Sequence, residues 1–387
     1  MKLFGRVFFV SSIFLVTLLV FSCASAPVRW YMKDDSPWRV AVVDKTVPHA
    51  NYREHGALFW LLRHEKIGSP IGARDWTLDR HYVGFAPTPD NPEQRGEGRD
   101  LTARDLANAD LLFLADTYGV YEGDYLEQRG DIAALDYSVQ IYGGLSTEEA
   151  AIVEDFATAD GHHLIAEFNT FASPTSRPAR ETMEGLLGLR WTGWTGRYFS
   201  ELADEAEVPV WARREYLDQY EEEWNFSGPG YLLVHENTTI FVLRESLDIA
   251  REGLTIRVRA GGALMDGVLD GVSFNYWFDI VAPDEASEVP AVFHLDLLDS
   301  GRAIAERFGV PSEFPAVVVG SRDPLRMYFA GDFSDAGGNL GPHWLEGLPW
   351  LNKSLLSLWF PRTTAQEPFY WGFYIPLLRN TFSAIAP

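Results

Sequence analysis

Three short apolar runs constrain the fold of this chain most strongly. They read WRVAVVD (38–44), DLLFLAD (110–116) and LIAE (164–167). Each is apolar at successive positions, whereas a strand with one face in water alternates apolar and polar residues. An uninterrupted apolar strand is typical of a parallel sheet that helices cover on both faces. The three runs therefore predict a buried parallel sheet.

Helical patterns lie between and after these runs, and several carry end signals. Ser146 and Glu149 form a capping box, and the helix that they start would stop at Gly161. Pro178 suits the first turn of the following helix. Helices are expected at 55–66, 101–109, 146–161 and 178–188, and a short strand at 79–87. This alternation predicts an α/β fold with a Rossmann-like parallel sheet, right-handed crossovers and helices on both faces.

The pattern changes after about residue 200. Three segments resemble antiparallel strands, and a fourth reads as a hairpin about Asp323-Pro324. These segments are 231–243, 254–260, 274–283 and 314–333. The aromatic tail is expected to form a helix. The predicted parts are an α/β core (38–204), a β-rich extension (205–315), and closing strands with a C-terminal helix that complete the core (316–387).

Residues 1–22 form a predicted signal peptide rather than part of the fold. A short basic region and an apolar stretch lead to Val20-Phe21-Ser22-Cys23. This arrangement resembles a bacterial lipoprotein signal, in which the cysteine is acylated and becomes the new N-terminus, although Phe21 is bulkier than is usual there. A plain secretory signal, cut slightly later, is the weaker alternative. We expect an exported protein that is lipid-anchored to a bacterial membrane through Cys23, with residues 23–37 as a tether.

Composition limits both partners and chemistry. Cys23 is the only cysteine, and its acylation would remove thiol catalysis from the candidate mechanisms. The formal charge is −23, and it becomes two units more negative when Lys2 and Arg6 leave with the signal. Such a surface repels nucleic acid and anionic headgroups. We therefore expect no nucleic-acid partner, and contact with the membrane through the lipid anchor only.

The order of the elements resembles the class I glutamine-amidotransferase-like fold. The segments that carry the resemblance are ANADLLFLADTYG, GGLSTEEAAIVEDFATADGHHLIAEF and LLGLRWTGW. The most similar branch is the trehalose-utilisation type, which lacks the amidotransferase triad and closes with a strand pair and a C-terminal helix. FPAVVVGSRDPLRMYFAGDF and the aromatic tail fit that ending. The resemblance covers roughly residues 38–200 and the last seventy, and it implies an amidotransferase-like core.

The departures from that fold family limit what the resemblance implies. Amidotransferases place a nucleophilic cysteine on a glycine-flanked elbow and a His-x-Glu pair near the end of the chain. Here the corresponding strand end reads AEFNTF, without cysteine or elbow glycines, and no matching His-x-Glu pair follows. Glutamine hydrolysis is therefore not carried over. The blocks DKTVP, ADTYGVY and AEFNTFASPTS also resemble a group of bacterial lipoproteins, and that resemblance implies no activity.

Acidic residues stand where three predicted inner strands end. They are Asp44, Asp116 and Glu167, and Asp332 follows a fourth strand. In open α/β sheets, ligands bind outside the carboxyl ends of the strands. A single acid at a strand end is more often a turn former or a helix cap. Several at one edge would crowd like charges, which raises the pKa of one member or requires a balancing cation.

The sequence thus predicts a ligand site at this edge. Asp116 and Glu167 are candidates for a catalytic acid/base pair, as in a glycosidase-like hydrolase. The candidate binding residues are Asp44, Lys45, Tyr118, Asn169, Arg180, Trp194 and Asp332, with Lys45 and Arg180 balancing charge and Tyr118 and Trp194 walling the pocket. The expected ligand is a neutral polar molecule, carbohydrate or cell-wall derived.

Three function classes stay open at this point. A ligand-binding lipoprotein and a carboxylate-dependent hydrolase are favoured equally, and a structural envelope lipoprotein without a ligand is the third. No cofactor is expected, because no dinucleotide or phosphate-binding motif follows a strand. No metal site is expected, because the nine histidines show no ligand spacing such as HExxH.

Overall fold

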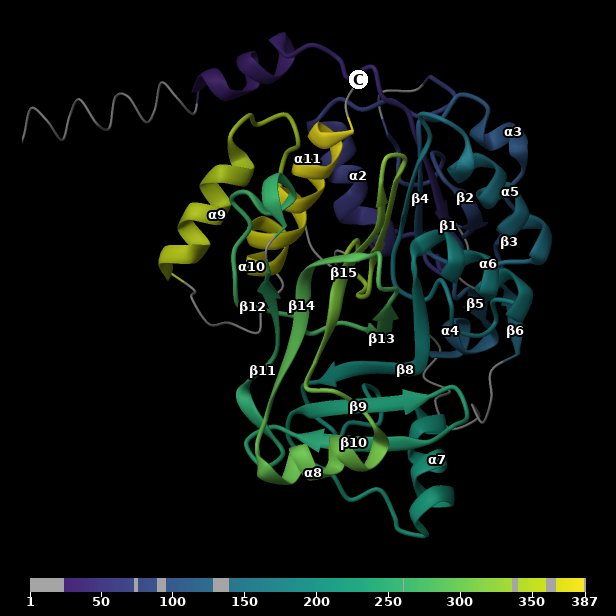
Figure 1. The fold of residues 1–387 in the computed structure, drawn as a ribbon, viewed down its shortest axis with the longest axis vertical. Helices are drawn as coiled ribbons and strands as arrows, with labels where there is room; N and C mark the ends of the chain where they lie inside the picture. Colours follow the sequence, from purple (N-terminus) through teal and green to yellow (C-terminus); the bar gives the residue numbers. More distant parts are fainter. Residues whose placement is uncertain are drawn as a thin grey trace, which may run out of the picture.

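Two sheets organise the molecule in the computed structural model (Figure 1). A ten-stranded sheet has the order β12-β11-β14-β15-β16-β7-β4-β1-β2-β3, and a four-stranded sheet has the order β10-β9-β8-β13. A pair of short strands, β5 (Val120–Tyr121) and β6 (Gln140–Tyr142), lies apart from both. The structure describes residues 24–72, 76–88, 95–127, 139–259, 261–335, 340–359 and 367–385.

The centre of the large sheet is parallel, which confirms the predicted fold class. Its strands are β2 (Val83–Ala86), β1 (Val40–Asp44), β4 (Leu111–Asp116), β7 (His163–Ala166) and β16 (Leu325–Phe329), and each pairs in parallel with the next. Every residue of β1, β4 and β7 is buried, as their uninterrupted apolar sequences predict. These strands therefore form the middle of the core.

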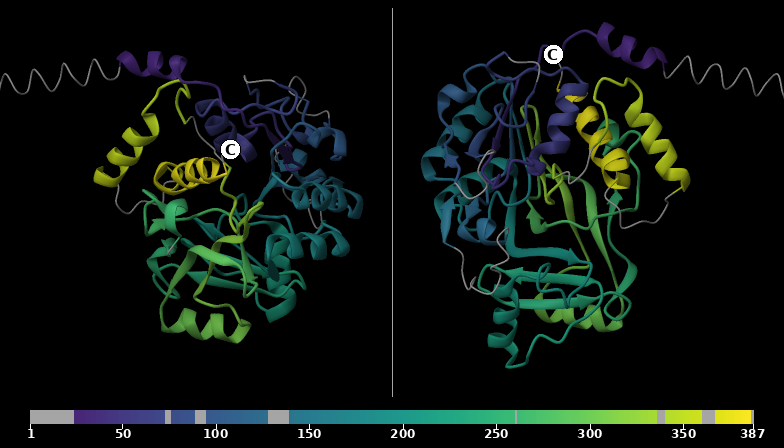
Figure 2. Two further views of the ribbon diagram at one scale, coloured as in Figure 1. Left: turned by 45° about the horizontal axis from the view of Figure 1, so that its top comes forward. Right: turned by 180° about the vertical axis from the view of Figure 1, so that it is seen from behind.

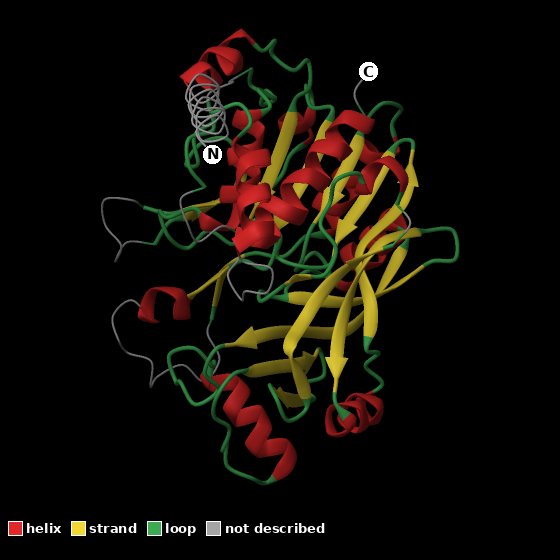
Figure 3. Ribbon diagram, turned by 90° about the vertical axis from the view of Figure 1, so that its left-hand side faces the viewer, coloured by secondary structure: helices red, strands yellow, loops and turns green. Residues whose placement is uncertain are grey.

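Helices cover both faces of the parallel strands (Figure 1). On one side lie α2 (Gly56–His64) and α11 (Ile375–Ala384), and on the other lie α3 (Ala103–Leu106), α5 (Thr147–Thr158) and α6 (Arg177–Leu187). The predicted capping box of α5 is present, since Ser146 Oγ accepts from the Glu149 backbone N–H at 3.1 Å. In Figure 3 helices cover the parallel strands in the upper half, while the lower half is mostly strand.

The large sheet continues in antiparallel fashion beyond β16. The added strands are β15 (Glu313–Arg322), β14 (Glu288–Leu297), β11 (Ile249–Val258) and β12 (Val272–Ser273), and β3 (Glu97–Gly98) closes the opposite edge. The predicted hairpin about Asp323-Pro324 is formed by β15 and β16. Because β16 returns beside β7, the end of the chain completes the sheet that its beginning starts.

The four-stranded sheet contains β8 (Leu189–Phe199), β9 (Gly230–His235), β10 (Ile240–Arg244) and β13 (Phe278–Pro283). Helices α7 (Val210–Tyr220) and α8 (Asp299–Phe308) lie beside it, at the lower end in Figure 1. The two sheets meet where Phe278 bridges Gly331 and the Asp279 N–H donates to Ala330 O at 2.8 Å. This junction lies just beyond the end of β16.

The C-terminal segment packs against the same region. It comprises α10 (Glu367–Phe369), the π-helical turn η4 (Tyr370–Tyr374) and α11. Phe369 and Phe333 pack with Phe274 at ring-centroid distances of 5.0–5.3 Å.

The remaining elements are a helix at 24–32, η1 (Arg53–His55), α4 (Glu122–Glu127), η3 (Gly262–Met265) and α9 (Leu348–Trp359). No helix in the described ranges is long and apolar enough to cross a membrane.

Candidate functional site at the carboxyl edge of the parallel strands

The four acids at the predicted strand ends lie at one edge of the large sheet. Asp44 and Asp116 are the last residues of neighbouring strands, and they pair in register across β1 and β4. Burial and the charge of Asp44 raise the pKa of Asp116 to about 7. Burial, then Asp335, Asp116 and Glu167, raise the pKa of Asp332 well above its usual range. The acids therefore share one electrostatic environment.

Two further acids from outside the predicted set join them. Glu54 lies in η1, directly before α2, and Asp335 follows β16. Burial, then the charge of Asp44, raises the pKa of Glu54 well above its usual range. We call the carboxyl groups gathered here the acid edge; it comprises Asp44, Glu54, Asp116, Glu167, Asp332 and Asp335.

Asp44 is held by a buried histidine. Its Oδ2 lies 2.6 Å from His55 Nδ1, and both side chains are fully buried. His55 Nε2 lies 3.0 Å from Leu78 O, and because a carbonyl only accepts, Nε2 carries a proton. The remaining proton of the pair lies between Nδ1 and Oδ2. Asp44 thus fixes the start of α2, and no part of it is open to a ligand in this conformation.

Glu167 also has an internal task. Its Oε2 accepts from the Ser334 N–H at 2.9 Å and lies 2.8 Å from Ser334 Oγ, while Tyr374 O–H donates to Oε1 at 3.0 Å. Burial raises the pKa of Glu167 to about 8 although these hydrogen bonds oppose the shift. Ser334 Oγ also donates to Glu54 O at 2.8 Å, and a hydroxyl has one proton to give. The Glu167 carboxyl therefore holds a proton and donates it to Ser334 Oγ.

The position of Glu167 favours a structural role over the predicted catalytic one. Its side chain is fully buried, and both oxygens are used to join β7 to the segment after β16 and to the C-terminal helix. A catalytic carboxyl must reach the substrate within hydrogen-bond distance. In this conformation Glu167 reaches other parts of the protein instead.

Asp116 has one firmly bound and one weakly engaged carboxyl oxygen. Oδ1 accepts from Thr46 O–H and from the Tyr118 N–H, each at 2.7 Å. Oδ2 receives only a long contact, 3.4 Å, from Asn169 Nδ2. Asn169 adopts a left-handed conformation with φ 66°, which asparagine tolerates better than most residues and which turns the chain back toward Asp116. With a pKa of about 7, Asp116 exchanges its proton near neutral pH.

Arg53 connects the two acids that the sequence interpretation missed. Its Nε lies 3.4 Å from Glu54 Oε1 and 3.5 Å from Asp335 Oδ2. The other oxygens, Glu54 Oε2 and Asp335 Oδ1, are buried and have no hydrogen-bond partner in the part of the chain that the structure describes. Glu54 is 8% exposed and Asp335 2% exposed. A buried polar atom without a partner is costly, so two in one place require an explanation.

Aromatic and cationic side chains border this region. The Trp277 ring stacks on Phe168, the residue after Glu167, with ring centroids 6.2 Å apart. Arg197 lies over the Trp277 ring as well, with its guanidinium carbon 5.5 Å from the ring centroid. The Asp332 N–H donates to Trp277 O at 3.0 Å, so the partly exposed Asp332 lies beside them. Among the described residues, none donates a hydrogen bond to the Asp332 carboxyl.

Three of the predicted binding residues lie away from the acid edge. Lys45 is buried and binds Glu149 Oε2 at 2.7 Å and Gly144 O at 2.8 Å, under the Tyr142 ring. Lys45 therefore balances Glu149, not the strand-end acids. Arg180 donates to Phe171 O and to Glu236, each at 2.7 Å, and so ties the chain after β7 to the β9–β10 hairpin.

Trp194 belongs to the interior beside the four-stranded sheet. It is 8% exposed and packs against Phe241 and Phe308 at ring-centroid distances of 5.2 and 6.1 Å. It therefore supplies core packing in the four-stranded sheet, not a pocket wall. Tyr118 stays at the edge, 39% exposed beside Asp116, with its ring 4.8 Å from that of Tyr121. Cys23 lies outside the described residues.

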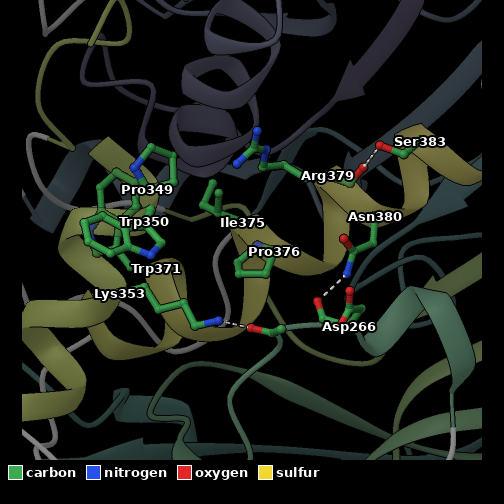
Figure 4. A pocket seen from close by; sticks show the side chains of 11 residues that line it. Asp266, Pro349, Trp350, Lys353, Trp371, Ile375, Pro376, Arg379, Asn380 and Ser383 are labelled. Carbon is green, nitrogen blue, oxygen red and sulfur yellow. Dashed lines mark hydrogen bonds between the residues drawn. The ribbon is translucent and has the colours of Figure 1, made fainter. Parts of the chain in front are cut away.

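A hollow of the surface lies away from the acid edge. It has a volume of about 310 Å³ and is lined by α9, α11 and the turn at Asp266 and Gly267 (Figure 4). Its polar groups already have partners: Lys353 Nζ donates to Gly267 O, and Asn380 Nδ2 donates to Asp266 O at 2.8 Å. Arg379 pairs with Glu65 at 2.7 Å. The hollow therefore offers a ligand little free hydrogen-bonding capacity.

The donor set does not form a metal centre. Within the described ranges, no group of three or more His, Cys, Asp or Glu side chains has the geometry to hold a metal ion. At the acid edge His55 has both ring nitrogens engaged, and two of the carboxyls are bound to other parts of the protein. The arrangement instead presents carboxyl oxygens beside guanidinium and aromatic groups.

Most of the residues missed from the sequence lie just after strand ends at the same edge. Arg53 and Glu54 lie in η1, between β1 and α2, and Asp335 follows β16, and this is where α/β sheets carry ligand sites. The run REH between the first strand and its helix, and FSD after the hairpin, were available signals. Trp277 gave no such signal, because it arrives from the segment before β13, a strand of the other sheet.

Comparison with known proteins gives one structural relative to report. No family model and no curated protein matches the sequence. Among solved structures, the chain is similar to a protein from Bacteroides uniformis that is described as thua-like. The match has 9% sequence identity and a TM-score of 0.40, and it covers 91% of this chain and 93% of that chain. The function is therefore argued from the geometry of the acid edge.

Proposed function

We propose that this protein binds a neutral, hydroxyl-rich small molecule, such as a carbohydrate or a cell-wall-derived sugar, at the acid edge. The supporting observation is the pair of buried, unpartnered carboxyl oxygens, Glu54 Oε2 and Asp335 Oδ1, on the two sides of Arg53. Ligand hydroxyls that donate to these oxygens would satisfy them. Asp332 and Asp116 Oδ2 supply further open acceptors nearby.

The protonation of the acid edge supports a neutral ligand over a charged one. With pKa values of about 7 and 8, the carboxyls of Asp116 and Glu167 are partly or largely protonated at neutral pH. Such an edge contains both donors and acceptors, and a hydroxyl group uses both. An anionic ligand would meet the remaining carboxylates and the strongly negative surface of the chain.

Aromatic side chains at the border fit the same ligand class. Trp277 and Tyr118 are partly exposed there, and aromatic faces pack against the apolar C–H surface of a sugar ring. Arg53 and Arg197 hold several N–H donors in fixed planes, which suits recognition of oxygen atoms. The proposed subsite therefore combines stacking with hydrogen bonds from both cationic and acidic groups.

A hydrolytic function is the second candidate, and Asp116 carries it. A carboxyl with a pKa of about 7 and one weakly engaged oxygen meets the requirements of a general acid/base. Glu167 is not available as its partner, so the second group would be Asp332 or Asp335. The variant Asp116→Asn separates the two functions. Turnover lost with affinity retained supports the hydrolase, and affinity lost with no turnover in either protein supports the binding protein.

We also propose that the protein is exported and held at a bacterial membrane through acylated Cys23. The sequence of residues 1–23 supports this placement. A membrane-tethered binding protein would meet sugars and envelope fragments outside the cytoplasm. Mass spectrometry of the mature N-terminus tests the proposal, and an unmodified thiol at Cys23 would contradict it.

The binding proposal is tested by thermal-shift screening of the chain from Ser25 against neutral saccharides, polyols and muropeptides, with uronic acids as charged contrasts. A ligand that binds only the native state raises the melting temperature. The isosteric variant Asp335→Asn should lose most of that rise. Glu236→Gln, which alters the Arg180 contact away from the acid edge, should keep it. A ligand response that Asp335→Asn leaves intact would place binding elsewhere.

A further inference from the structure

Exposed apolar side chains gather in two segments of the molecule. In the described part of the chain, twelve large apolar residues are at least 39% exposed. Half of them belong to the helix at 24–32 and to the segment 344–355. They are Val28, Tyr31, Met32, Trp344, Trp350 and Leu355. Met32, Tyr31 and Trp350 are each at least 70% exposed, which is unusual for side chains of this size.

The two segments are joined through Trp30. Its indole N–H donates to His64 O at 2.9 Å, and its ring lies 5.4 Å from that of His343, next to Trp344. Lys66 Nζ lies 4.9 Å from the Trp30 ring centroid. The helix at 24–32 therefore packs through Trp30 and Ala26 and leaves Val28, Tyr31 and Met32 exposed to water. Both views of Figure 2 show this helix and α9 at the same end of the molecule.

The segment 344–355 likewise directs apolar side chains outward. Trp350 lies at the rim of the hollow in Figure 4, whereas Trp371 beneath it is 3% exposed. Lys353 is tied down by its hydrogen bond to Gly267 O. The helix α9 is thus held against the body of the protein. Trp350 is exposed because of its place on this fixed helix. We call the six exposed side chains the apolar end face.

We infer that the apolar end face rests on the lipid bilayer to which the chain is anchored; this inference depends on the proposed acylation of Cys23. Cys23 directly precedes residue 24, the first described residue of the helix, and stands five positions before Val28, so an acyl group on it would hold Val28, Tyr31 and Met32 near the bilayer surface. Tryptophan, tyrosine and aliphatic side chains favour the membrane interface. Because the chain is strongly negative, the contact would depend on burial of apolar surface rather than on attraction to anionic headgroups.

The fold gives this orientation a consequence for the acid edge. The helix α2 runs from the acid edge, where Glu54 precedes it, to the apolar end face, where His64 accepts from Trp30. Its nine residues span about 14 Å at 1.5 Å per residue. The parallel strands β1 and β4 run in the opposite direction to α2, so their carboxyl ends point away from the helix at 24–32. A membrane under the apolar end face would therefore leave the acid edge open to the aqueous side.

The single cysteine makes a direct test straightforward. The full-length chain, expressed with its own signal and reconstituted in zwitterionic phosphatidylcholine vesicles, carries Trp350→Cys or Tyr31→Cys with an environment-sensitive fluorophore on the new thiol. The emission of both labels is expected to shift to the blue on reconstitution, relative to detergent-free protein from Ser25. Leu217→Cys and Leu247→Cys, which are 39% and 58% exposed in the extension, are the matched controls and should show no shift.

Each other outcome contradicts either the acylation of Cys23 or the contact between the apolar end face and the bilayer. If the wild-type chain reacts with the thiol reagent, Cys23 is not acylated and the anchor fails. If mass spectrometry finds acylated Cys23 but the labels at 350 and 31 stay in water, the anchor stands and the resting face is overturned. A blue shift that follows protein concentration without vesicles would assign the face to a second copy of the chain. Because these side chains are exposed, unchanged melting temperatures should accompany all four variants.

Discussion

Glu167 shows how a single residue can fit a sequence pattern for a reason that the pattern does not contain. It stands at a strand end beside other acids, as predicted, yet its oxygens bind Ser334 and Tyr374, which are 167 and 207 residues away along the chain. Nothing near AEFNT identifies those partners. The sequence therefore predicted the location of this carboxyl but not its environment, and the same holds for Lys45, whose partner Glu149 lies 104 residues away.

The raised pKa of Glu167 predicts a pH-dependent stability. Its folded-state value of about 8 exceeds the ordinary 4.5, so the protonated native state contributes stability that is complete below pH 4.5 and is lost as the pH rises through 8. At ~1.4 kcal/mol per pKa unit, the loss is on the order of 5 kcal/mol. Glu167→Gln cannot ionise and should flatten this part of the profile, as urea unfolding between pH 5 and pH 8.5 would measure.

The control for that experiment is Glu154→Gln, at an exposed position of α5. It should leave the pH profile of the unfolding free energy unchanged. A wild-type protein that is as stable at pH 8.5 as at pH 5 would show that Glu167 is ionised in the native state. The proton assigned between Glu167 and Ser334 Oγ would then be wrong.

At the scale of elements, buried ion pairs join segments that sequence patterns treat separately. Lys45 follows β1, and Glu149 lies in the first turn of α5, where it also accepts from the Leu101 and Ser146 N–H groups at 3.0 Å. Lys45→Met leaves Glu149 buried without its cation, which should cost about 3–5 kcal/mol. Lys45→Met with Glu149→Gln should cost less than the sum of the single changes, because no unpaired charge remains.

Denaturant unfolding of the four proteins in that cycle measures the coupling. The matched control is the exposed pair Arg177–Glu181, at 3.0 Å on α6, where Arg177→Gln should change stability by about 1 kcal/mol or less. If Lys45→Met costs no more than Arg177→Gln, the buried pair contributes nothing beyond a surface contact. Its role in holding α5 against β1 would then be disproved.

Element identity was more predictable than element pairing, for a physical reason. The parallel strands and the helices α2, α5 and α6 follow from local periodicity and capping residues. The strand β8 pairs with β9 and β13, which come from residues 230–235 and 278–283, so its place in the second sheet depends on contacts that no local pattern encodes. The strand β14 at 288–297 was missed, although seven of its ten residues are apolar.

At the scale of the whole molecule, the chain closes on itself. The strands β1, β4 and β7 come from its first half, while β16 and the segment 367–385 come from its end and cover the same edge. The acid edge therefore exists only when both ends are in place: Asp44, Glu54 and Asp116 arrive early in the sequence, and Asp332 and Asp335 arrive almost 300 residues after the first of them. Cooperative folding of both parts is a requirement for the site.

Removal of the chain from Glu367 onward should therefore abolish the native fold rather than trim it. Nine large side chains of this segment are buried, and each contributes about 1.5–3 kcal/mol on burial, which together exceeds the net stability of about 5–15 kcal/mol of an ordinary domain. The truncated protein should lack near-ultraviolet circular dichroism and a cooperative melting transition. Deletion of 24–32, where Ala26 alone is buried, is the matched control and should keep both. A truncated chain that still melts cooperatively would show that the strands of the large sheet fold without their C-terminal cover, and the acid edge would then not depend on Tyr374.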